Sequence, residues 1–577
     1  MSGSSDERSL ATQLAAMDVP ALAALLHRRG VAASANWHDA FDAAEALLDA
    51  ASVDRALIAL PRPLLIALAT AGAGPVEPAG RARLAGLALL HADGTVLRGV
   101  AGRVAAQRTE HPDAFLPLPA PEPPARADAA AEAAAAERAV MAVAALADLL
   151  ALGAEQPVTT TAAGAVSATD RRRLVELHLV GDGDELDDLL ATGRDAGLLQ
   201  PVDREWRLTE RGAAWLPGST LERWTSIASS LRDALPKSLR TASGGMLPPE
   251  AWHAVVPLDP AWPSRTAAMR RRAVRWGLWT PDGAEPAWTV PLRAGDAPGT
   301  ETLASVIPAE IDAIYLQADL SAIAPGPLQP SLDLRLRTMA DRESRAQAST
   351  YRFSEESLAA AVAAGETAAT IREFLSRLSL TGIPQPLDYL IDRTTARHGL
   401  VRVRADAATA RTHVESDDAH LLQTISVDHA LRSIGLVPNE AGLVSRVSRE
   451  AVFWTLADAR YPVVAIGDDG APESLRRRRP LVAAAASADP ATALRPLAER
   501  IRSGGGDSDT AWLERELDQA VRARATITVA VRLPDSSTRE FTLEATGMGG
   551  GRLRGRDRGA DIERTLPVSS IVGVRPA

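Results

Sequence analysis

The sequence predicts a multidomain protein of mixed α+β and α/β class, and three observations lead to this class. The chain has 577 residues, enough for three or four domains. Hydrophobic residues make up 46% and charged residues 24% of it, the ordinary balance of a protein with packed cores. Helical periodicity dominates the first half, and alternating segments join helical ones later. We therefore expect a helical, winged-helix-like N-terminal half, an α/β domain and a small C-terminal β-barrel.

Residues 1–108 are predicted to be helical and winged-helix-like. Asp18 favours a helix start and Gly30 a helix end. Further helices are predicted through DAFDAAEALLDAA and RPLLIALATAG. The stretch LLHADGTVLRGV then predicts two short strands joined at Asp93–Gly94, a favoured hairpin turn. Helices followed by a hairpin are typical of a winged helix, although any small helical domain can carry a hairpin.

A proline-rich linker, residues 109–130, precedes a second helical winged-helix domain at 131–300. After an Ala-rich helix, TTTAAGAVSATDRRRLVELHLV predicts a helix capped by Thr169 or Asp170. DELDDLLATGRDAGLLQ predicts another helix, and LLQPVDREWRLT predicts a wing hairpin. Tryptophans are dense from 215 to 288 in a chain with only 4% aromatic residues. We expect them to hold helices together, with nucleobase stacking as the alternative.

The arginines of this second domain are candidate DNA contacts. Arg171, Arg172 and Arg173 follow one another near a predicted helix start, where they could contact phosphate. The alternative is that they are solvated and lie beside an acidic partner face.

Residues 301–470 predict an α/β domain, because strand patterns and helix patterns alternate. DAIYLQADLSAIAP predicts a buried strand, LDLRLRTMADRES a helix and ASTYRFS a short strand. Ser354 favours the start of the next helix, and Gly399 favours the end of the helix in LDYLIDRTTARHG. Between 302 and 470 there are 16 Arg against 22 Asp plus Glu, so this block is net acidic.

The last hundred residues predict a linker and a small barrel. Residues 471–510 contain four arginines, 476–479, an Ala-rich stretch and a Gly run, which indicate a linker or a loosely held helix. Residues 511–577 predict one helix and four or five short strands, the size of a small β-barrel. From 521 to 577 there are 10 Arg against 6 acidic residues, so this end is locally basic.

The chain lacks the residues on which nucleotide chemistry depends. Lys237 is its single lysine, and it stands in LPKSLR with no glycine-rich turn before it. A P-loop needs G-x-x-x-x-G-K-[ST], because backbone N–H groups and the lysine hold the phosphates. The sequence also has no H-E-x-x-H and no G-x-S-x-G. We expect no enzyme activity, no metal and no cofactor.

Cysteine usage, net charge and hydropathy bear on compartment and partners. With no cysteine, disulfides and zinc–thiolate sites are excluded, and a reducing cytosol is the expected compartment. No apolar N-terminal segment and no run of 18 apolar residues is present, so we expect a cytoplasmic or nucleoid-associated protein without a membrane partner. The net charge of −10 requires any DNA contact to come from local patches.

The block 314–399 contains YLQADLSAIAPGPLQPSL, ADRESRAQASTYRFSEESLAAAVAAG and FLSRLSLTGIPQPLDYLIDRTTARHG in that order. With its continuation to 470, it resembles the helicase-associated domain related to the N-terminal region of XPB helicases, helicase conserved C-terminal domain 3. The resemblance implies a role in DNA repair or processing beside an XPB-like helicase acting in trans, and it brings no catalytic residues. Its candidate DNA contacts are Tyr351, Arg352, Arg393, Arg397 and His398; helix-end salt bridges are the alternative for them.

The C-terminal stretch from ITVAVRL to SSIVGV is similar to WYL-type domains, small Sm-like barrels that sense ligands or nucleic acid. The Trp-Tyr-Leu signature itself is absent. Arg552, Arg554 and Arg556 are the candidate DNA contacts of this part.

Two functions follow from these observations. The first is a non-catalytic, helicase-associated DNA-binding or accessory protein, whose DNA affinity would fall steeply with salt. The alternative is a protein-interaction scaffold or transcriptional regulator with a ligand-sensing C-terminal barrel, which would bind DNA weakly.

Overall fold

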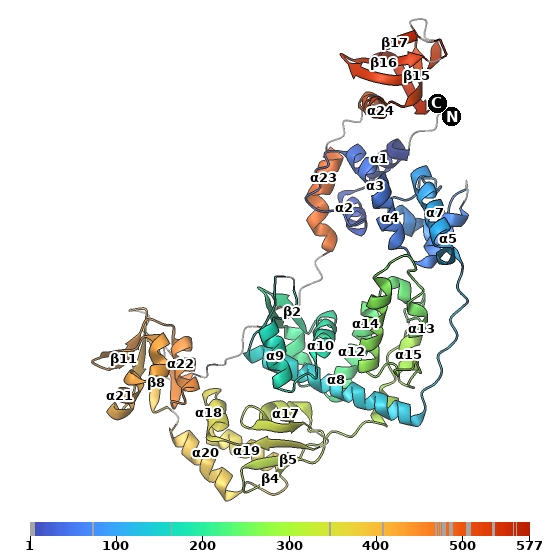
Figure 1. Ribbon diagram of the computed structural model, residues 1–577. Helices are drawn as coiled ribbons and strands as arrows, with labels where there is room; N and C mark the ends of the chain where they lie inside the picture. The colour runs from blue at the N-terminus through green and yellow to red at the C-terminus, as the bar shows by residue number, and fades with distance from the viewer. Residues whose placement is uncertain are drawn as a thin grey trace. The chain divides into compact units, whose positions relative to one another are not determined.

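The computed structural model of the chain describes residues 6–71, 74–162, 164–345, 348–397, 399–406, 409–467, 470, 472–473, 475, 481–483, 489–503, 509–533, 537–557, 559–560 and 562–576. Helices and several sheets make it a mixed α and β protein, as the sequence predicts (Figure 1). It divides into two compact units. The first comprises residues 1–122, 249–266 and 486–577, and the second 123–248 and 267–485. The first unit therefore draws on both ends of the chain.

The first unit begins with a group of short helices. They are α1 (Asp6–Ala16), α2 (Val19–Arg28), α3 (Ala40–Leu48), α4 (Ala50–Ile58), α5 (Arg62–Thr70), α6 (Pro78–Ala85) and α7 (Arg98–Glu110), followed by the 3₁₀ turn η1 (Pro112–Phe115). Asp18 caps α2 by accepting from the Ala21 N–H at 2.7 Å, as predicted. The single helix predicted through DAFDAAEALLDAA is two helices, because Asp49 caps a new one at Ala51 and Ser52.

The hairpin predicted before residue 100 is only partly present. Leu90 and Val96 form one isolated bridge around the turn at Asp93–Gly94, and no strand follows. Helix α7 begins at Arg98 instead, because it buries Val100 and Val104 one turn apart in the core. Neither of the two predicted strands therefore forms beyond this bridge. Residues 116–125 carry neither helix nor strand, the extended course that their prolines predict.

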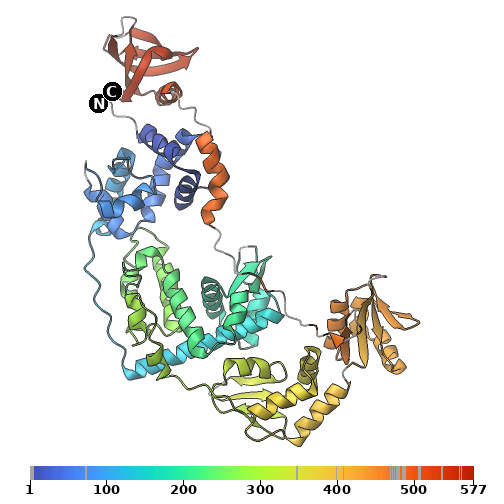
Figure 2. The same ribbon diagram turned by 180° about the vertical axis from the view of Figure 1, so that it is seen from behind.

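Part of the predicted linker 471–510 is a core element. Residues 490–503 form the 3₁₀ helix η4 (Pro490–Leu494) and α23 (Arg495–Ser503). Leu494, Leu497 and Ile501 recur at helical spacing and are buried in the same cluster as Leu14 and Leu22 of α1 and α2. Both views show α23 beside these helices (Figures 1 and 2). The linker interpretation does not hold for this stretch, and arginines 476–479 lie outside the described residues.

The chain ends in one helix and one antiparallel sheet. The elements are α24 (Asp509–Ala523), β14 (Thr526–Arg532), β15 (Thr538–Gly549), β16 (Arg552–Asp557), β17 (Ile562–Pro567), the 3₁₀ turn η5 (Val568–Ser570) and β18 (Ile571–Pro576). The strand order is β17-β16-β15-β14-β18, so the last strand returns to pair with the first. Leu517 of α24 packs on Val529, Leu543 and Leu553 in the core of this sheet.

The second unit begins with helices around a three-stranded sheet. In chain order come α8 (Ala129–Glu155), β1 (Val158–Thr159), α9 (Ala168–Glu176), α10 (Gly183–Asp195), β2 (Leu199–Val202), β3 (Glu205–Leu208), α11 (Glu210–Trp215), α12 (Thr220–Ala234), η2 (Lys237–Leu239), α13 (Pro249–Trp252), α14 (Trp262–Arg275), α15 (Thr289–Ala294) and α16 (Thr300–Ala304). Helix α13 and the start of α14 belong to the first unit. The sheet order is β1-β3-β2, and β2 and β3 form the predicted hairpin. The cap of α9 is Ser167, and neither Thr169 nor Asp170.

The tryptophans are core residues, as predicted. Those at positions 215, 224, 252, 262, 276, 279 and 288 are all buried. The Trp224 indole N–H donates to the Trp276 carbonyl at 2.9 Å, and the Trp288 indole N–H donates to the Gly277 carbonyl at 2.8 Å. Gly277 has φ +65°, and a Cβ there would meet the Ala135 carbonyl oxygen at 2.3 Å. These rings therefore fix the packing of helices, and none presents a free face to a nucleobase.

Residues 301–470 form two sheets with separate cores, where a single α/β domain was expected. The first sheet, β4 (Tyr315–Leu316), β5 (Ser321–Ala324), β7 (Ser349–Arg352) and β6 (Asp341–Arg345) in that order, is accompanied by α17 (Pro330–Leu336), α18 (Glu355–Ala363), α19 (Ala368–Leu378) and α20 (Gln385–Arg397). The second, in the order β10 (Val437–Asn439), β11 (Gly442–Ser445), β9 (Arg411–Glu415), β8 (Val401–Asp406), β12 (Val463–Ile466) and β13 (Pro472–Glu473), is accompanied by α21 (Ala419–Val427), η3 (His429–Ile434) and α22 (Arg449–Asp458).

Two local differences explain how the first of these sheets forms. The segment LDLRLRTMADRES was predicted to be helical, but α17 ends at Leu336 and β6 begins at Asp341. DAIYLQADLSAIAP holds two strands and not one, because the chain reverses at Leu320, whose φ is +67°. Beyond Gly399 the apolar positions Val401 and Val403 face a different core.

None of the described helices is both long and apolar enough to cross a membrane.

Candidate nucleic-acid interface

The β15–β16 hairpin positions the arginines of the C-terminal sheet. Its turn consists of Gly550 and Gly551, whose φ angles are +59° and +73°. Two successive positive φ angles suit a tight hairpin with the right-handed twist of the strands, and glycine adopts them without strain. The turn fixes the register, so that Gly549 faces Arg552 across the two strands.

Strand β16 alternates strictly between the core and solvent. Leu553 and Gly555 are buried, and Arg552, Arg554 and Arg556 are exposed. A Cβ at position 555 would meet the Leu543 Cδ1 at 2.2 Å and the Glu544 carbonyl oxygen at 2.9 Å, so glycine is favoured on the inner face there. Because side chains alternate along a strand, the three arginines share the outer face of the sheet.

The neighbours of these arginines differ along the strand. Arg554 faces Gly547 on β15 and Thr565 on β17, and Arg552 faces Gly549 and Pro567. Arg556 faces two carboxylates, Glu544 and Glu563. Facing residues are the closest cross-strand neighbours, so Arg552 and Arg554 have uncharged neighbours in register, and Arg556 does not. The two arginines near the hairpin turn thus form the open cationic end of this face.

The arginines predicted on α9 are largely engaged within the protein. Arg171 donates to both carboxylate oxygens of Asp187, at 2.8 and 3.1 Å, and to the Gly183 carbonyl. Arg173 forms an ion pair with Asp170 at 2.8 Å and donates to Gln156. Arg172 is the one exposed arginine of these three, so the run presents a single exposed cation and not a cluster. Arg171 and Arg173 are half-buried and ion-paired within the chain, so they are neither free for phosphate nor solvated beside a partner's acidic face.

Helix α10, which carries Asp187, presents further carboxylates. Three arginines of α14 bind its carboxylates. Arg271 contacts Asp188 at 2.9 Å, and Arg275 contacts Glu185 at 3.0 Å. Arg272 contacts Asp195 at 2.9 Å. Acidic side chains repel phosphate, and these are already held in place by arginines.

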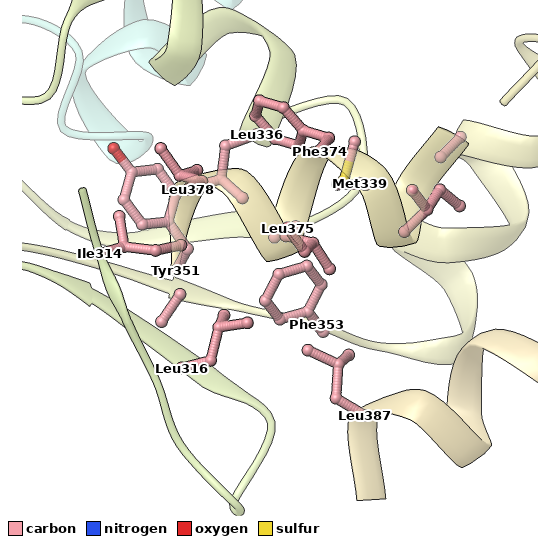
Figure 3. Packing of buried hydrophobic residues seen from close by; sticks show 14 of the residues in the cluster. Ile314, Leu316, Leu336, Met339, Tyr351, Phe353, Phe374, Leu375, Leu378 and Leu387 are labelled. Carbon is pink, nitrogen blue, oxygen red and sulfur yellow. The ribbon is translucent and has the colours of Figure 1, made fainter. Parts of the chain in front are cut away.

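Tyr351 is part of the protein core. It is 1% exposed, and its ring packs with Ile314, Leu336 and Leu378 (Figure 3). Its hydroxyl donates to the Asp333 carboxylate at 2.6 Å. Burial first, and then Asp333, raises the pKa of Tyr351 above its ordinary value. The prediction of a DNA contact is wrong for this residue, because its ring has no access to solvent.

The other candidates of this block are paired or undescribed. Arg352 donates to Glu343 and to the Asp319 carbonyl. Arg393 lies 3.5 Å from a carboxylate oxygen of Glu355, the helix-end ion pair offered as the alternative. The side chain of Arg397 and all of His398 lie outside the described residues. Of the described candidates, Tyr351 is therefore buried, and Arg352 and Arg393 are ion-paired within the chain.

A charged cluster that the sequence analysis missed centres on Asp148 in α8. Its carboxylate binds Arg337 at 2.8 Å and also binds Arg342. Asp148 is 2% exposed. The available signal was a single acidic residue within the apolar stretch AVAALADLLAL, since a buried carboxylate requires cationic partners.

A hollow in the first unit is lined by Glu7, Asn36, Trp37, Asp42, Glu45 and Asp49, so its charge repels anions. Among the described residues, no three His, Asp or Glu side chains are grouped to hold a metal ion.

Comparison with known proteins identifies one region. The family model described as helicase conserved C-terminal domain matches residues 314–439, from the start of the four-stranded sheet to the end of β10. No curated protein matches the chain. The match covers the block in which the sequence resemblance was found, and it supports a helicase-associated, helicase-related role for that block.

Proposed function

We propose that this protein is a helicase-associated accessory protein without a motor, which contacts nucleic-acid phosphates through Arg552 and Arg554. The XPB-like character of residues 314–439 is part of this proposal, as is a role in DNA repair or processing in the cytoplasm or on the nucleoid. Its motor would be an XPB-like helicase acting in trans. The family match at 314–439 supports the helicase association.

The environment of β16 is the observation that supports the proposed contact with nucleic acid. Four of the nine predicted arginines, 171, 173, 352 and 393, already bind carboxylates of this chain. Arg552 and Arg554 are exposed and face uncharged neighbours. A guanidinium presents planar donors that suit phosphate oxygens, and such contacts carry no sequence information. We therefore expect sequence-independent, salt-sensitive binding.

Two finer fold assignments belong to the same proposal. In β14–β18 the last strand pairs with the first after a 3₁₀ turn, which favours a small Sm-like or WYL-like barrel. The order α8-β1-α9-α10-β2-β3 with the sheet β1-β3-β2 favours a winged helix. In that fold α10 takes the position of the DNA-reading helix. Because α10 is acidic and bound by α14, we propose that this winged helix is structural and reads no DNA.

The absence of a motor rests on the single lysine. Lys237 begins the 3₁₀ turn η2 directly after Pro236, with no glycine-rich loop before it. Without a P-loop lysine the chain has no means of holding the β- and γ-phosphates of ATP. We therefore propose that it is not an ATPase, and a DNA-stimulated ATPase assay on the purified protein tests this directly.

The contact of Arg552 and Arg554 with phosphate is tested by fluorescence anisotropy. The ligands are single-stranded, duplex and forked DNA over a range of salt concentrations. The double variant Arg552→Gln/Arg554→Gln removes two cations from the outer face of β16. We expect weaker binding to all DNA and a salt slope lower by about 2, since each phosphate contact contributes about 0.9. No binding by the unmodified protein at low salt would refute the proposal.

A matched control separates a local contact from general charge. Arg522→Gln/Arg524→Gln removes the same charge from exposed residues at the end of α24. We expect this variant to bind like the unmodified protein. Equal losses in both double variants would mean that net charge, and not the β16 face, governs binding.

Protein interaction is the second candidate function, and the acidic balance of residues 302–470 favours it. Purification of the tagged protein from native extract, followed by mass spectrometry, tests it. Recovery of a helicase supports the accessory role, and recovery of no stable partner counts against the scaffold alternative.

A further inference from the structure

Asp148 joins helix α8 to the domain of residues 311–397 within the second unit. Its carboxylate accepts from the Arg337 Nη1 at 2.8 Å and from Arg342. The two arginines come from the end of α17 and from β6, so one carboxylate holds two elements of the other domain. Leu146, Leu149 and Leu150 around it on α8 are buried.

A second layer of charge surrounds this contact. Asp333 lies 3.6 Å from Arg337 and 3.8 Å from Arg342, and it accepts the hydroxyl of Tyr351. From the side of α12, Arg223 is buried 5.2 Å from the Trp215 ring and interacts electrostatically with Asp333. A third carboxylate, Glu310, accepts from the Thr220 N–H at 2.6 Å. The carboxylates of Asp148, Asp333 and Glu310 thus equal in number the guanidiniums of Arg223, Arg337 and Arg342.

The apolar core of the domain is complete without α8 and α12. Its buried cluster draws only on residues 314–391, with partly buried neighbours from Ile311 onward. The contacts named above are hydrogen bonds and ion pairs. Polar interfaces of this kind are typical of domains that separate, because opening them hydrates charges and leaves each core intact.

We propose that this contact is a joint that opens and closes, with Asp148 as the residue that holds it shut. In the closed state the Asp148 carboxylate pairs with Arg337 and Arg342. In the open state water solvates all three groups, so the ion pairs are exchanged for hydration at small net cost. The joint sets the position of the helicase-like domain relative to α8. It is independent of DNA contact at β16.

The chain has no cysteine, so two introduced cysteines are the only thiols that a spin label can modify. Glu176→Cys on α9 and Glu373→Cys on α19 replace exposed residues on the two sides of the joint. Spin labels on this pair report the separation by double electron–electron resonance. We expect one narrow distance distribution at about 0.1 M salt, and an added, longer population at about 1 M salt, because salt stabilises the exposed, separated charges of the open state more than the buried pairs of the closed state.

Substitution of the central residue tests the assignment. Asp148→Asn in the labelled protein removes the negative charge and keeps the shape, so we expect the narrow distribution to be lost at about 0.1 M salt. The control Asp187→Asn removes a carboxylate that Arg171 binds within the α9–α10 region, and it leaves the distribution unchanged.

The distance distributions of the labelled proteins decide whether the joint opens. A single unchanged distance in Asp148→Asn and in the salt titration of the unmodified sequence would overturn it. If Asp148→Asn fails to fold, as near-ultraviolet circular dichroism of the buried tryptophans would report, the salt titration decides alone. Loss of DNA binding in β16 variants with an unchanged joint would leave this inference standing.

Discussion

Arg500 and Trp37 are 463 residues apart in the chain, yet the Arg500 Nε–H donates to the Trp37 carbonyl oxygen at 2.9 Å. A second donor of Arg500 reaches the Ala35 carbonyl at 2.8 Å. This pair ties α23 to the loop between α2 and α3, and the buried side chains of α23 complete the core of the N-terminal helices.

The stability of the N-terminal helices therefore depends on α23. Ile501→Ala removes a fully buried side chain from that core, and we expect a loss of about 2–5 kcal/mol in the free energy of unfolding. Urea unfolding followed by circular dichroism measures it. The control Glu499→Ala changes an exposed residue of the same helix and should cost no more than about 0.5 kcal/mol. Equal effects of the two changes would contradict the placement of α23.

Removal of the Tyr351 hydroxyl tests the structural role of this residue. Tyr351→Phe keeps the buried ring and leaves Asp333 without its hydroxyl donor, so we expect a loss of about 1–3 kcal/mol in stability. DNA affinity should not change. Tyr389→Phe is the matched control, since Tyr389 is 66% exposed. Reduced DNA affinity in Tyr351→Phe with unchanged stability would restore the contact role that the sequence suggested.

Acid should weaken the start of α9 through Asp170. Burial pushes the pKa of Asp170 upward, but hydrogen bonds from Thr159 and Ser167 outweigh it, so the pKa lies below its ordinary value. A lowered pKa in the folded state adds stability above the unfolded pKa of about 3.9, which is lost as pH falls through the folded value. Asp170→Asn should thus be less stable at pH about 7 and lose less stability on acidification.

Unfolding midpoints at several pH values measure this dependence. Asp184→Asn, a change at an exposed residue of α10, serves as the control and should follow the unmodified protein. If Asp170→Asn and the unmodified protein lost stability in parallel on acidification, the carboxylate would not be responsible.

Two glycines of the C-terminal sheet should respond differently to the same change. A Cβ at Gly555 would collide with Leu543 and the Glu544 carbonyl, so we expect Gly555→Ala to cost about 1–3 kcal/mol. A Cβ at Gly547 meets nothing within 4 Å, and Gly547→Ala should be tolerated. Thermal unfolding and DNA anisotropy compare the two. A destabilised Gly547→Ala protein would indicate a different register of β15 and β16.

The sequence alone determined the local features of this protein. Caps such as Asp18 and Ser354 and strands such as ASTYRFS follow from side-chain chemistry within a few residues, and the structure confirms them. The resemblance at 314–399 lies inside the region that the family model matches. The burial of the tryptophans also followed from composition, because large rings in an aromatic-poor chain usually fill cores.

Only the tertiary structure decided which charged residues are available. Arg171 and Arg554 look alike in the sequence, but one binds Asp187 and the other faces Gly547 and Thr565. Likewise, α23 carries an apolar stripe that indicates burial, but not that its partners lie more than 400 residues away. Pairing of charges and of helix faces depends on distances through space, which a pattern along the chain does not encode.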